Sequence, residues 1–305
     1  MDVTREGLIF DLKKYAINDG PGIRTTVFFK GCPLSCRWCH NPEGQSFGPE
    51  IMIRASRCLA DCSECVAACP EGAIVKTAAG LVIDRPRCTS CGKCADICPA
   101  QAIEVVGRRL SAAQLLQEIQ KDRIFQEDSG GGVTFSGGEP LSQPDFLSEI
   151  LELCREKEIH ATIDTCGFAP ADVLERIAEK TDLFLFDLKA IDEKKHLAFT
   201  GESNKLILEN LKRLAAKAKK IVVRIPVVPG VNDDEKNIRE TAEFLRSLGT
   251  IGEISLLPYH KLGRDKLRGL EKKAGGDDFT PPSAERLERI KRDLEDRGFR
   301  VSLGE

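Results

Sequence analysis

The chain has 305 residues, of which 41% are hydrophobic and 30% charged, and its formal net charge at pH 7 is −3. This composition is typical of a soluble globular protein with enough apolar residues for one large domain or two moderate ones. The slight negative charge argues against a nucleic-acid partner, and the absence of a long apolar run or a signal-peptide core argues against a membrane. A cytoplasmic protein is therefore expected.

The fold class is indicated by short apolar runs of strand character that alternate with helix-patterned stretches. Six strands are predicted, at residues 25–29, 133–136, 161–165, 183–188, 221–228 and 253–257. Each is followed by turn or polar residues, as is typical of parallel strands that are buried on both faces. The pattern predicts an α/β fold with a parallel sheet.

Two helices stand out between and after these strands. Apolar residues from Phe146 to Cys154 are spaced for one helical face, which predicts that the Cys154 thiol lies in the core. A last helix is predicted to begin near Ser283 and to stop at Gly298, covering the end of the barrel or sheet.

Eleven of the 13 cysteines fall into three tight groups. Thiols stay reduced in the cytosol, and cysteines two or three residues apart can bind one soft metal cluster more easily than they can form unstrained disulfides. The grouping predicts metal centres rather than a disulfide framework.

Residues 48–107 interrupt the alternation of strands and helices and contain eight of these cysteines. We predict that they form an inserted module, and that residues 1–47 and 108–305 form the larger domain. The two halves of the module, residues 58–74 and 88–103, each run from cysteines through Cys-Pro to an Ala-Ile pair. They therefore form an internal repeat.

The cysteine spacing in the module resembles that of bacterial two-cluster ferredoxins. The two runs are Cys58-x3-Cys62-x2-Cys65-x3-Cys69-Pro70 and Cys88-x2-Cys91-x2-Cys94-x3-Cys98-Pro99. The resemblance implies one 4Fe-4S cluster on Cys58, Cys62, Cys65 and Cys98, and a second on Cys88, Cys91, Cys94 and Cys69. The alternative is a pair of zinc sites, since four thiolates also bind zinc, but Cys-Pro after a three-residue gap is typical of the ferredoxin pattern.

The third group, Cys32-x3-Cys36-x2-Cys39, follows the first predicted strand and offers only three thiolates. A 4Fe-4S cluster held by three cysteines has one iron without a protein ligand, and a reactive metal centre needs such an open position. A zinc knuckle completed by His40 is the alternative, although His40 is poorly placed to join the adjacent Cys39 on one tetrahedron. The stretch 31–43 (GCPLSCRWCHNPE) resembles the signature of the radical S-adenosylmethionine (SAM) superfamily, which implies that the methionine moiety of SAM chelates the open iron.

Polar groups follow several of the later strands. Gly137 and Gly138 permit close backbone approach, and Glu139 could accept hydrogen bonds from a cationic amine, although this stretch alone could also be an ordinary turn. Downstream of the three-cysteine loop it resembles the methionine-binding strand end of the same superfamily. The ends of parallel strands are where catalytic groups of α/β folds collect, and four further strands contribute polar side chains there. These side chains are Asp164, Thr165, Asp187, Lys189, Arg224 and His260.

The whole chain, opening with residues 19–28 (DGPGIRTTVF), resembles the activating enzymes of glycyl radical enzymes, in the branch with a two-cluster ferredoxin insert. The resemblance implies a partial (β/α)6 barrel of radical SAM type with an inserted ferredoxin-like domain, three 4Fe-4S clusters, SAM and a monovalent cation. It implies that the catalytic cluster is held by Cys32, Cys36 and Cys39. The implied cofactor-binding residues are Trp38, Cys39, His40, Gly137, Gly138, Glu139, Asp187, Leu188, Lys189, Arg224 and His260. The implied cation ligands are Asp164, Thr165 and Asp187.

The activity implied by this resemblance is reductive cleavage of SAM and abstraction of a hydrogen atom from a backbone glycine of a partner glycyl radical enzyme. The expected setting is anaerobic, with an external one-electron donor such as a flavodoxin or ferredoxin. The two module clusters could relay electrons or help to dock the partner. Two alternatives remain: a radical SAM enzyme acting on a small molecule or peptide, and a non-enzymatic electron carrier with several clusters.

Two smaller features complete the sequence. The charge-rich stretch 264–278 is expected to be a solvated loop, with a contact to a partner as the alternative. Cys166 is expected to be a small buried residue.

Overall fold

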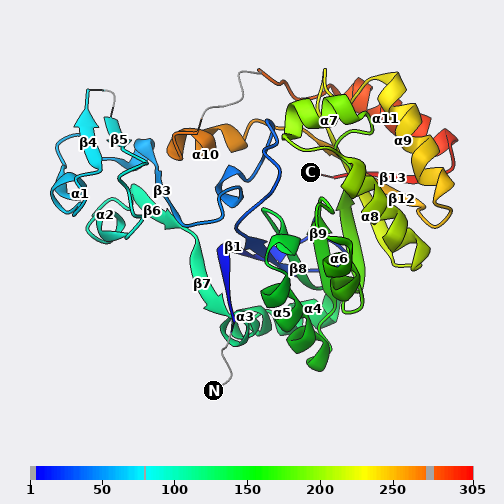
Figure 1. The fold of residues 1–305 in the computed structure, drawn as a ribbon, viewed down its shortest axis with the longest axis horizontal. Helices are drawn as coiled ribbons and strands as arrows, with labels where there is room; N and C mark the ends of the chain where they lie inside the picture. The colour runs from blue at the N-terminus through cyan, green and yellow to red at the C-terminus, as the bar shows by residue number, and fades with distance from the viewer. Residues whose placement is uncertain (1–4, 79, 273–277, 305) are drawn as a thin grey trace.

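The computed structural model describes residues 5–78, 80–272 and 278–304, and a nine-stranded sheet runs through them in the order β13-β12-β11-β10-β9-β8-β2-β1-β7 (Figure 1). Its central strands pair in parallel. They are β2 (Arg24–Phe29), β8 (Gly132–Gly137), β9 (Ala161–Thr165), β10 (Leu183–Asp187), β11 (Ile221–Val227) and β12 (Glu253–Pro258). All six coincide with predicted strands, so the α/β fold with a parallel sheet is confirmed.

Three outer strands of this sheet were not expected from the sequence. β1 (Glu6–Ala16) and β7 (Arg108–Ser111) pair antiparallel at one edge, and β13 (Arg300–Leu303) pairs in parallel with β12 at the other. Their side chains are largely exposed or half-buried, so they do not form the apolar runs by which buried strands are recognised. Because β7 and β13 remain edges, the sheet does not close into a full barrel, in agreement with the predicted partial barrel.

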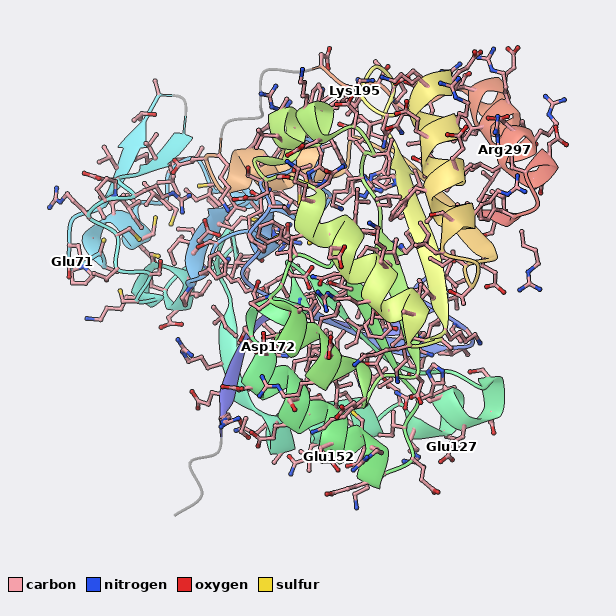
Figure 2. The ribbon with its side chains drawn as sticks, turned by 45° about the vertical axis from the view of Figure 1, so that its right-hand side comes forward. Glu71, Glu127, Glu152, Asp172, Lys195 and Arg297 are labelled. Atoms are coloured by element: carbon pink, nitrogen blue, oxygen red, sulfur yellow. The ribbon has the colours of Figure 1, made fainter. Side chains whose placement is uncertain are left out.

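Helices lie before, between and after the parallel strands, and most of them pack an apolar face in the main core. They are α3 (Ala112–Gln120), α4 (Arg123–Ser129), α5 (Pro144–Glu156), α6 (Ala171–Ala178), α7 (Glu193–Thr200), α8 (Lys205–Ala216), α9 (Glu235–Ser247), α10 (Gly263–Gly269) and α11 (Ala284–Asp296). Charged side chains such as Glu152, Asp172 and Arg297 project from the opposite faces (Figure 2). In the described part of the chain, no helix is long and apolar enough to cross a membrane.

Both helices predicted in detail are present. The Cys154 side chain on α5 is fully buried in the main core, as expected. The last helix, α11, begins after Ser283, whose side chain accepts a hydrogen bond from the Arg286 amide and so caps it. Its buried residues pack beside β12 and β13, at the end of the sheet.

The described residues from 50 to 106 form two small sheets, and none of them pairs with a strand of the large sheet. β3 (Glu50–Ile53) pairs with β6 (Ile103–Val106), and β4 (Ile74–Thr77) pairs with β5 (Gly80–Ile83). The short helices α1 (Glu64–Ala67) and α2 (Lys93–Asp96) each bury one cysteine. In Figure 1 this segment, which we call the cysteine-rich segment, lies at one side of the large sheet.

The two halves of the cysteine-rich segment repeat the same local structure. In the first half, the Ala73 amide donates a hydrogen bond to the Cys69 sulfur at 3.2 Å, and in the second the Ala102 amide donates to the Cys98 sulfur at 3.2 Å. Each of these amides precedes an isoleucine buried at the start of a strand. The sequence repeat is therefore also a structural repeat.

The prediction that residues 264–278 form a solvated loop is wrong for residues 264–272. Residues 264–269 belong to α10, and Leu270 is buried against Met52 and Val106 of the cysteine-rich segment. Residues 273–277 lie outside the described residues. In Figure 1, α10 lies between the cysteine-rich segment and the rest of the chain.

Candidate active site

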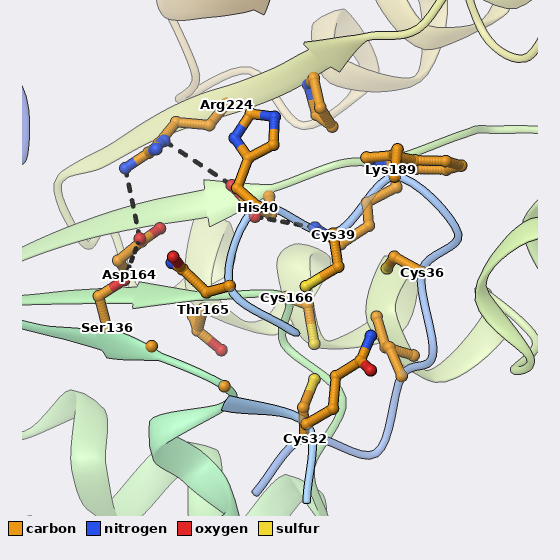
Figure 3. Close-up of a pocket in the computed structure, with 18 of the residues that line it drawn as sticks. Cys32, Cys36, Cys39, His40, Ser136, Asp164, Thr165, Cys166, Lys189 and Arg224 are labelled. Carbon is orange, nitrogen blue, oxygen red and sulfur yellow. Dashed lines mark hydrogen bonds and ion pairs between the residues drawn. The ribbon is translucent and has the colours of Figure 1, made fainter. Parts of the chain in front are cut away.

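The carboxyl ends of the parallel strands and the loop after β2 enclose one pocket (Figure 3). Parallel strands bring their carboxyl ends to the same edge of the sheet, so polar residues that are far apart in sequence meet there. The predicted residues that line it are Cys32, Cys36, Trp38, Cys39, His40, Gly137, Gly138, Asp164, Thr165, Asp187, Lys189 and Arg224. Three further predicted residues lie outside its lining: Glu139, Leu188 and His260.

The three cysteines of the loop after β2 all face this pocket. Burial raises the pKa of the Cys39 thiol to about 12 and also raises the pKa values of the Cys32 and Cys36 thiols. Such thiols stay protonated at neutral pH unless a bound metal supplies the compensating charge, because coordination deprotonates a thiol. The site therefore has the donor chemistry of a metal-thiolate centre.

A 4Fe-4S cluster and a single zinc ion require different arrangements of their cysteine ligands. Among the described residues, no three His, Cys, Asp or Glu side chains lie close enough together to hold a single metal ion. A 4Fe-4S cluster has several irons, so its cysteines surround the cluster instead of converging on one point. The geometry gives no support to a zinc knuckle completed by His40.

The end of β8 packs directly against the cysteine loop. Gly137 has φ of +114°, and a Cβ at Gly138 would lie 2.4 Å from the carbonyl oxygens of both Gly31 and Gly44. The Glu139 amide also donates a hydrogen bond to the Gly31 oxygen at 2.8 Å. Because Gly137 and Gly138 have no side chains, the cysteine loop can pack directly against the end of the sheet.

The Glu139 carboxylate is fully buried behind the pocket wall, where it joins the ends of β8 and β9. It accepts hydrogen bonds from the Leu141 amide at 3.0 Å, the Thr165 hydroxyl at 2.7 Å and the Cys166 amide at 2.8 Å. Burial raises its pKa, while these hydrogen bonds oppose the rise. The structure therefore gives Glu139 a positioning role.

Replacing Glu139 with alanine is expected to lower the free energy of unfolding by about 2–4 kcal/mol, because it leaves two amides and one hydroxyl without their acceptor in a buried site. The change should be measured by chemical denaturation of the cluster-free protein. Glu139→Gln retains an acceptor oxygen and should cost less than Glu139→Ala. Equal stability of the alanine variant and the unsubstituted protein would contradict this role.

Two carboxylates and a guanidinium meet on one side of the pocket. Asp164 accepts a hydrogen bond from the Ser136 hydroxyl at 2.6 Å and lies 3.3 Å from Nη1 of Arg224, while Asp187 lies 3.8 Å from Nε of Arg224 and 2.9 Å from Nζ of Lys189 (Figure 3). Burial raises the pKa of Asp164 to about 6, and Arg224 opposes that rise. A monovalent cation on Asp164, Thr165 and Asp187 would have to share these carboxylates with Arg224.

The ring of His40, which lines the pocket, stacks on the ring of His260. The rings of His40 and His260 lie 3.7 Å apart at an interplanar angle of 23°. His260 follows β12 and lies against His40 outside the pocket lining. The pKa of His40 is lowered to about 4, mainly by burial and secondly by the nearby His260. Its ring is therefore neutral at neutral pH.

Several buried polar atoms of this site have no hydrogen-bond partner among the described residues. They are Oδ1 of Asp164, Oδ1 of Asp187, Nε and Nη1 of Arg224, Nε2 of His40 and Nδ1 of His260. Buried polar groups are normally satisfied, so this set indicates a ligand that carries both donors and acceptors. An amino-acid group fits it: the carboxylates can accept from an ammonium group, and the guanidinium can donate to a carboxylate. These residues therefore fit the methionine moiety of SAM.

The cysteines of the cysteine-rich segment gather in two sets. Burial is the main cause that raises the pKa of the Cys65 thiol, and the charges of the neighbouring Cys58, Cys62 and Cys98 raise it further. A second small pocket is lined by Cys69, Cys88, Cys91 and Cys94. The fourth cysteine of each run thus lies with the first three of the other run, the arrangement expected from the ferredoxin spacing.

Some lining residues were not singled out as site residues in the sequence. Cys166 was expected only as a small buried residue; it is buried, and it also lines the pocket, with Cys32 and Glu139 among its neighbours. Its place directly after Asp164 and Thr165 at a strand end was the available signal. The other unpredicted lining residues are Leu34, Asn41, Gln45, Ser136, Pro226 and Leu257.

Comparison with known proteins identifies the family of the chain. The model of the radical SAM superfamily matches residues 26–245. The chain is 47% identical over 300 residues to the trans-4-hydroxy-L-proline dehydratase activating enzyme of Clostridioides difficile, covering 97% of this chain and 99% of that protein. It is 41% identical over 279 residues to the isethionate sulfite-lyase activating enzyme of Oleidesulfovibrio alaskensis, covering 90% of each chain.

A solved domain of the pyruvate-formate lyase-activating enzyme from Bacteroides vulgatus superposes with a TM-score of 0.50 at 39% identity, covering 58% of this chain and all of that one. These relatives are enzymes, so the alternative of a non-enzymatic electron carrier is wrong. The chain belongs to the radical SAM superfamily and, within it, to the activating enzymes of glycyl radical enzymes.

Proposed function

We propose that the chain activates a partner glycyl radical enzyme by reductive cleavage of SAM and removal of a hydrogen atom from a backbone glycine of that partner. One observation carries the proposal: three cysteines face a pocket that also gathers buried charged groups, several of whose atoms lack a hydrogen bond among the described residues and suit an amino-acid ligand. The relatives that the chain matches over nearly its whole length are activating enzymes.

Two sets of pocket residues would bind the cofactors. Cys32, Cys36 and Cys39 would hold the 4Fe-4S cluster, which when bound supplies the electron that cleaves the carbon-sulfur bond of SAM. Asp187, Lys189 and Arg224 would bind the methionine end of SAM through charged hydrogen bonds.

The glycine backbone at 137 and 138 allows close approach to this end of the ligand. Trp38 belongs to a buried apolar cluster with Val228, Tyr259 and Phe279 next to the pocket. Such a wall excludes water and limits side reactions of a radical.

Electron supply is the proposed role of the cysteine-rich segment. Its two sets of four cysteines would hold two further 4Fe-4S clusters, making three in the chain. Cys91 is exposed, so one of these clusters would lie near the surface, where an external donor such as a flavodoxin or ferredoxin could reach it. Thiolate-bound clusters and stored radicals react with oxygen, so the activity belongs in an anaerobic cytoplasm.

The partner is proposed from the relatives. The 47% identity to the trans-4-hydroxy-L-proline dehydratase activating enzyme makes that dehydratase the first partner to test. Isethionate sulfite-lyase and choline trimethylamine-lyase follow, since their activating enzymes are 41% and 40% identical to this chain.

Reconstituted, reduced protein mixed anaerobically with SAM should form 5'-deoxyadenosine and methionine, and adding the right partner should give the doublet of a glycyl radical in electron paramagnetic resonance. A partner with its radical glycine replaced by alanine is the control and should give no doublet. Absence of 5'-deoxyadenosine in protein with a full complement of iron would refute the proposal. Cleavage of SAM without a doublet on any of the three partners would reject those partners and leave the cleavage activity established.

A further inference from the structure

The segment from Gly263 to Lys272, which we call the α10 bracket, contacts two separate parts of the chain. At its first residue, a Cβ on Gly263 would lie 2.4 Å from the Cys39 carbonyl oxygen. Near its other end, a Cβ on Gly269 would lie 2.7 Å from the Ile53 carbonyl oxygen of the cysteine-rich segment. The helix therefore touches the backbone of both parts, and neither contact leaves room for a side chain.

Lys266 connects the bracket to the loop that follows Cys39. Its ammonium group lies 2.6 Å from Oε1 of Glu43 and donates a hydrogen bond to Oδ1 of Asn41 at 3.1 Å. Asn41 lines the cofactor pocket, and Glu43 is buried, with Oε2 lacking a hydrogen-bond partner among the described residues. A buried carboxylate needs a compensating charge, so Lys266 helps to fix this loop in place.

The same loop sets the position of the first cluster cysteine. The Gly44 carbonyl accepts a hydrogen bond from the Gly31 amide at 2.7 Å, and the Gln45 carbonyl accepts one from the Cys32 amide at 3.1 Å. Movement of residues 41–45 would therefore also move Cys32. Lys266 acts on the cofactor pocket through Asn41 and on the cysteine loop through Glu43.

Charged side chains at the other end of the bracket form hydrogen bonds and ion pairs with the cysteine-rich segment. The Glu271 carboxylate accepts hydrogen bonds from the Ile83 amide and from Nε of Arg85, both at 3.0 Å. Lys272 lies 3.0 Å from Oε1 of Glu50, whose other oxygen lies 2.8 Å from the buried ammonium group of Lys30. Lys30 immediately precedes the cysteine loop, so Glu50 joins the segment to both the bracket and the loop.

We propose that Lys266 is a positioning residue for SAM, and that the α10 bracket couples the cofactor pocket to the cysteine-rich segment. This inference rests on the proposed function, and it extends that function by naming how the two parts communicate. Displacement of the segment would pull on Glu271 and Lys272, and a short helix would transmit the movement to Lys266. Coupling of this kind is reciprocal, so SAM bound in the pocket would also stabilise the position of the cysteine-rich segment.

The test measures SAM binding by titration of anaerobically reconstituted protein, with hydrogen exchange of residues 40–46 as a second readout. K266M is expected to weaken SAM binding about 2- to 10-fold, the range typical of residues that couple two sites, and to speed exchange of these amides. K266R, which keeps the charge, should recover most of the affinity.

R268M is the matched control, since Arg268 lies on the same helix with its side chain largely exposed and pairs only with Asp265 in the described residues. It should bind SAM as the unsubstituted protein does. At the far end of the bracket, E271A should also weaken SAM binding, although Glu271 contacts no pocket residue.

Unchanged affinity and unchanged exchange in K266M would overturn the positioning role, and unchanged affinity in E271A would overturn the coupling. If K266M folds poorly, E43Q, which removes the charge that Lys266 pairs with, should weaken SAM binding and speed the same exchange, and E271A still tests the coupling. Failure of the unsubstituted protein to cleave SAM would instead count against the proposed function.

Discussion

A Cys36→Ser variant is expected to form no 5'-deoxyadenosine above background and to lose about four irons per chain on reconstitution. The cluster proposed after β2 would have three protein ligands at most, and Cys36 lies in the pocket with Cys32 and Cys39. Losing one thiolate leaves two, and serine, with a far higher pKa than cysteine, is a poor ligand for iron in this site. Iron and sulfide analysis and chromatography of the nucleoside products would measure both effects.

The matched control is Cys154→Ala. This thiol is fully buried in the main core on α5 and belongs to none of the three cysteine groups. Its loss should lower stability slightly and leave the iron content and SAM cleavage intact. Cleavage of SAM by Cys36→Ser at a rate near that of the unsubstituted protein would show that the reactive cluster is bound elsewhere.

The second large effect is expected from one methyl group at Gly138. A Cβ there would lie 2.4 Å from two carbonyl oxygens, those of Gly31 and Gly44, and contacts below 3.0 Å force something to move. The Gly31 oxygen is held by the Glu139 amide, and the Gly44 oxygen by the Gly31 amide. Gly138→Ala must therefore displace the cysteine loop from the end of β8.

We expect Gly138→Ala to lower the free energy of unfolding by about 1–3 kcal/mol, as is typical of overpacking, and to weaken SAM binding by at least about tenfold. Denaturation of the cluster-free protein and SAM titration of the reconstituted protein would measure the two effects. Gly252→Ala is the control, because a Cβ at that position meets no heavy atom within 4 Å and its φ is not positive. Similar behaviour of the two variants would mean that the loop is free to retreat from β8.

Much of the fold was predictable because its central strands are buried on both faces. A strand such as β10, with four buried residues in a row, leaves an apolar run that is visible in the sequence alone. The edge strands were missed for the opposite reason: β7 and β13 contain charged and exposed residues and depend on a neighbour to become strands. The same holds for α10, whose charged sequence looks like a loop until its packing partners are known.

Local sequence patterns likewise predict some features of the site, whereas others depend on residues that are distant in the sequence. The Cys32, Cys36 and Cys39 spacing is a property of neighbouring residues, and the ligand chemistry of thiolates follows from it. Glu139 shows the limit of such reasoning. Its position after two glycines suggested a carboxylate that binds an amine, whereas in the structure it accepts hydrogen bonds from the ends of two strands.

The sequence by itself determined the metal chemistry, the six parallel strands and the edge of the sheet at which the polar residues gather, because spacing and periodicity act over short stretches of chain. Only the tertiary structure decided which distant groups meet. Arg224 pairs with both Asp164 and Asp187 because β9, β10 and β11 are neighbours, and Lys266 reaches Asn41 across 225 residues. Such contacts depend on the packing of whole elements, and no local pattern in the chain encodes them.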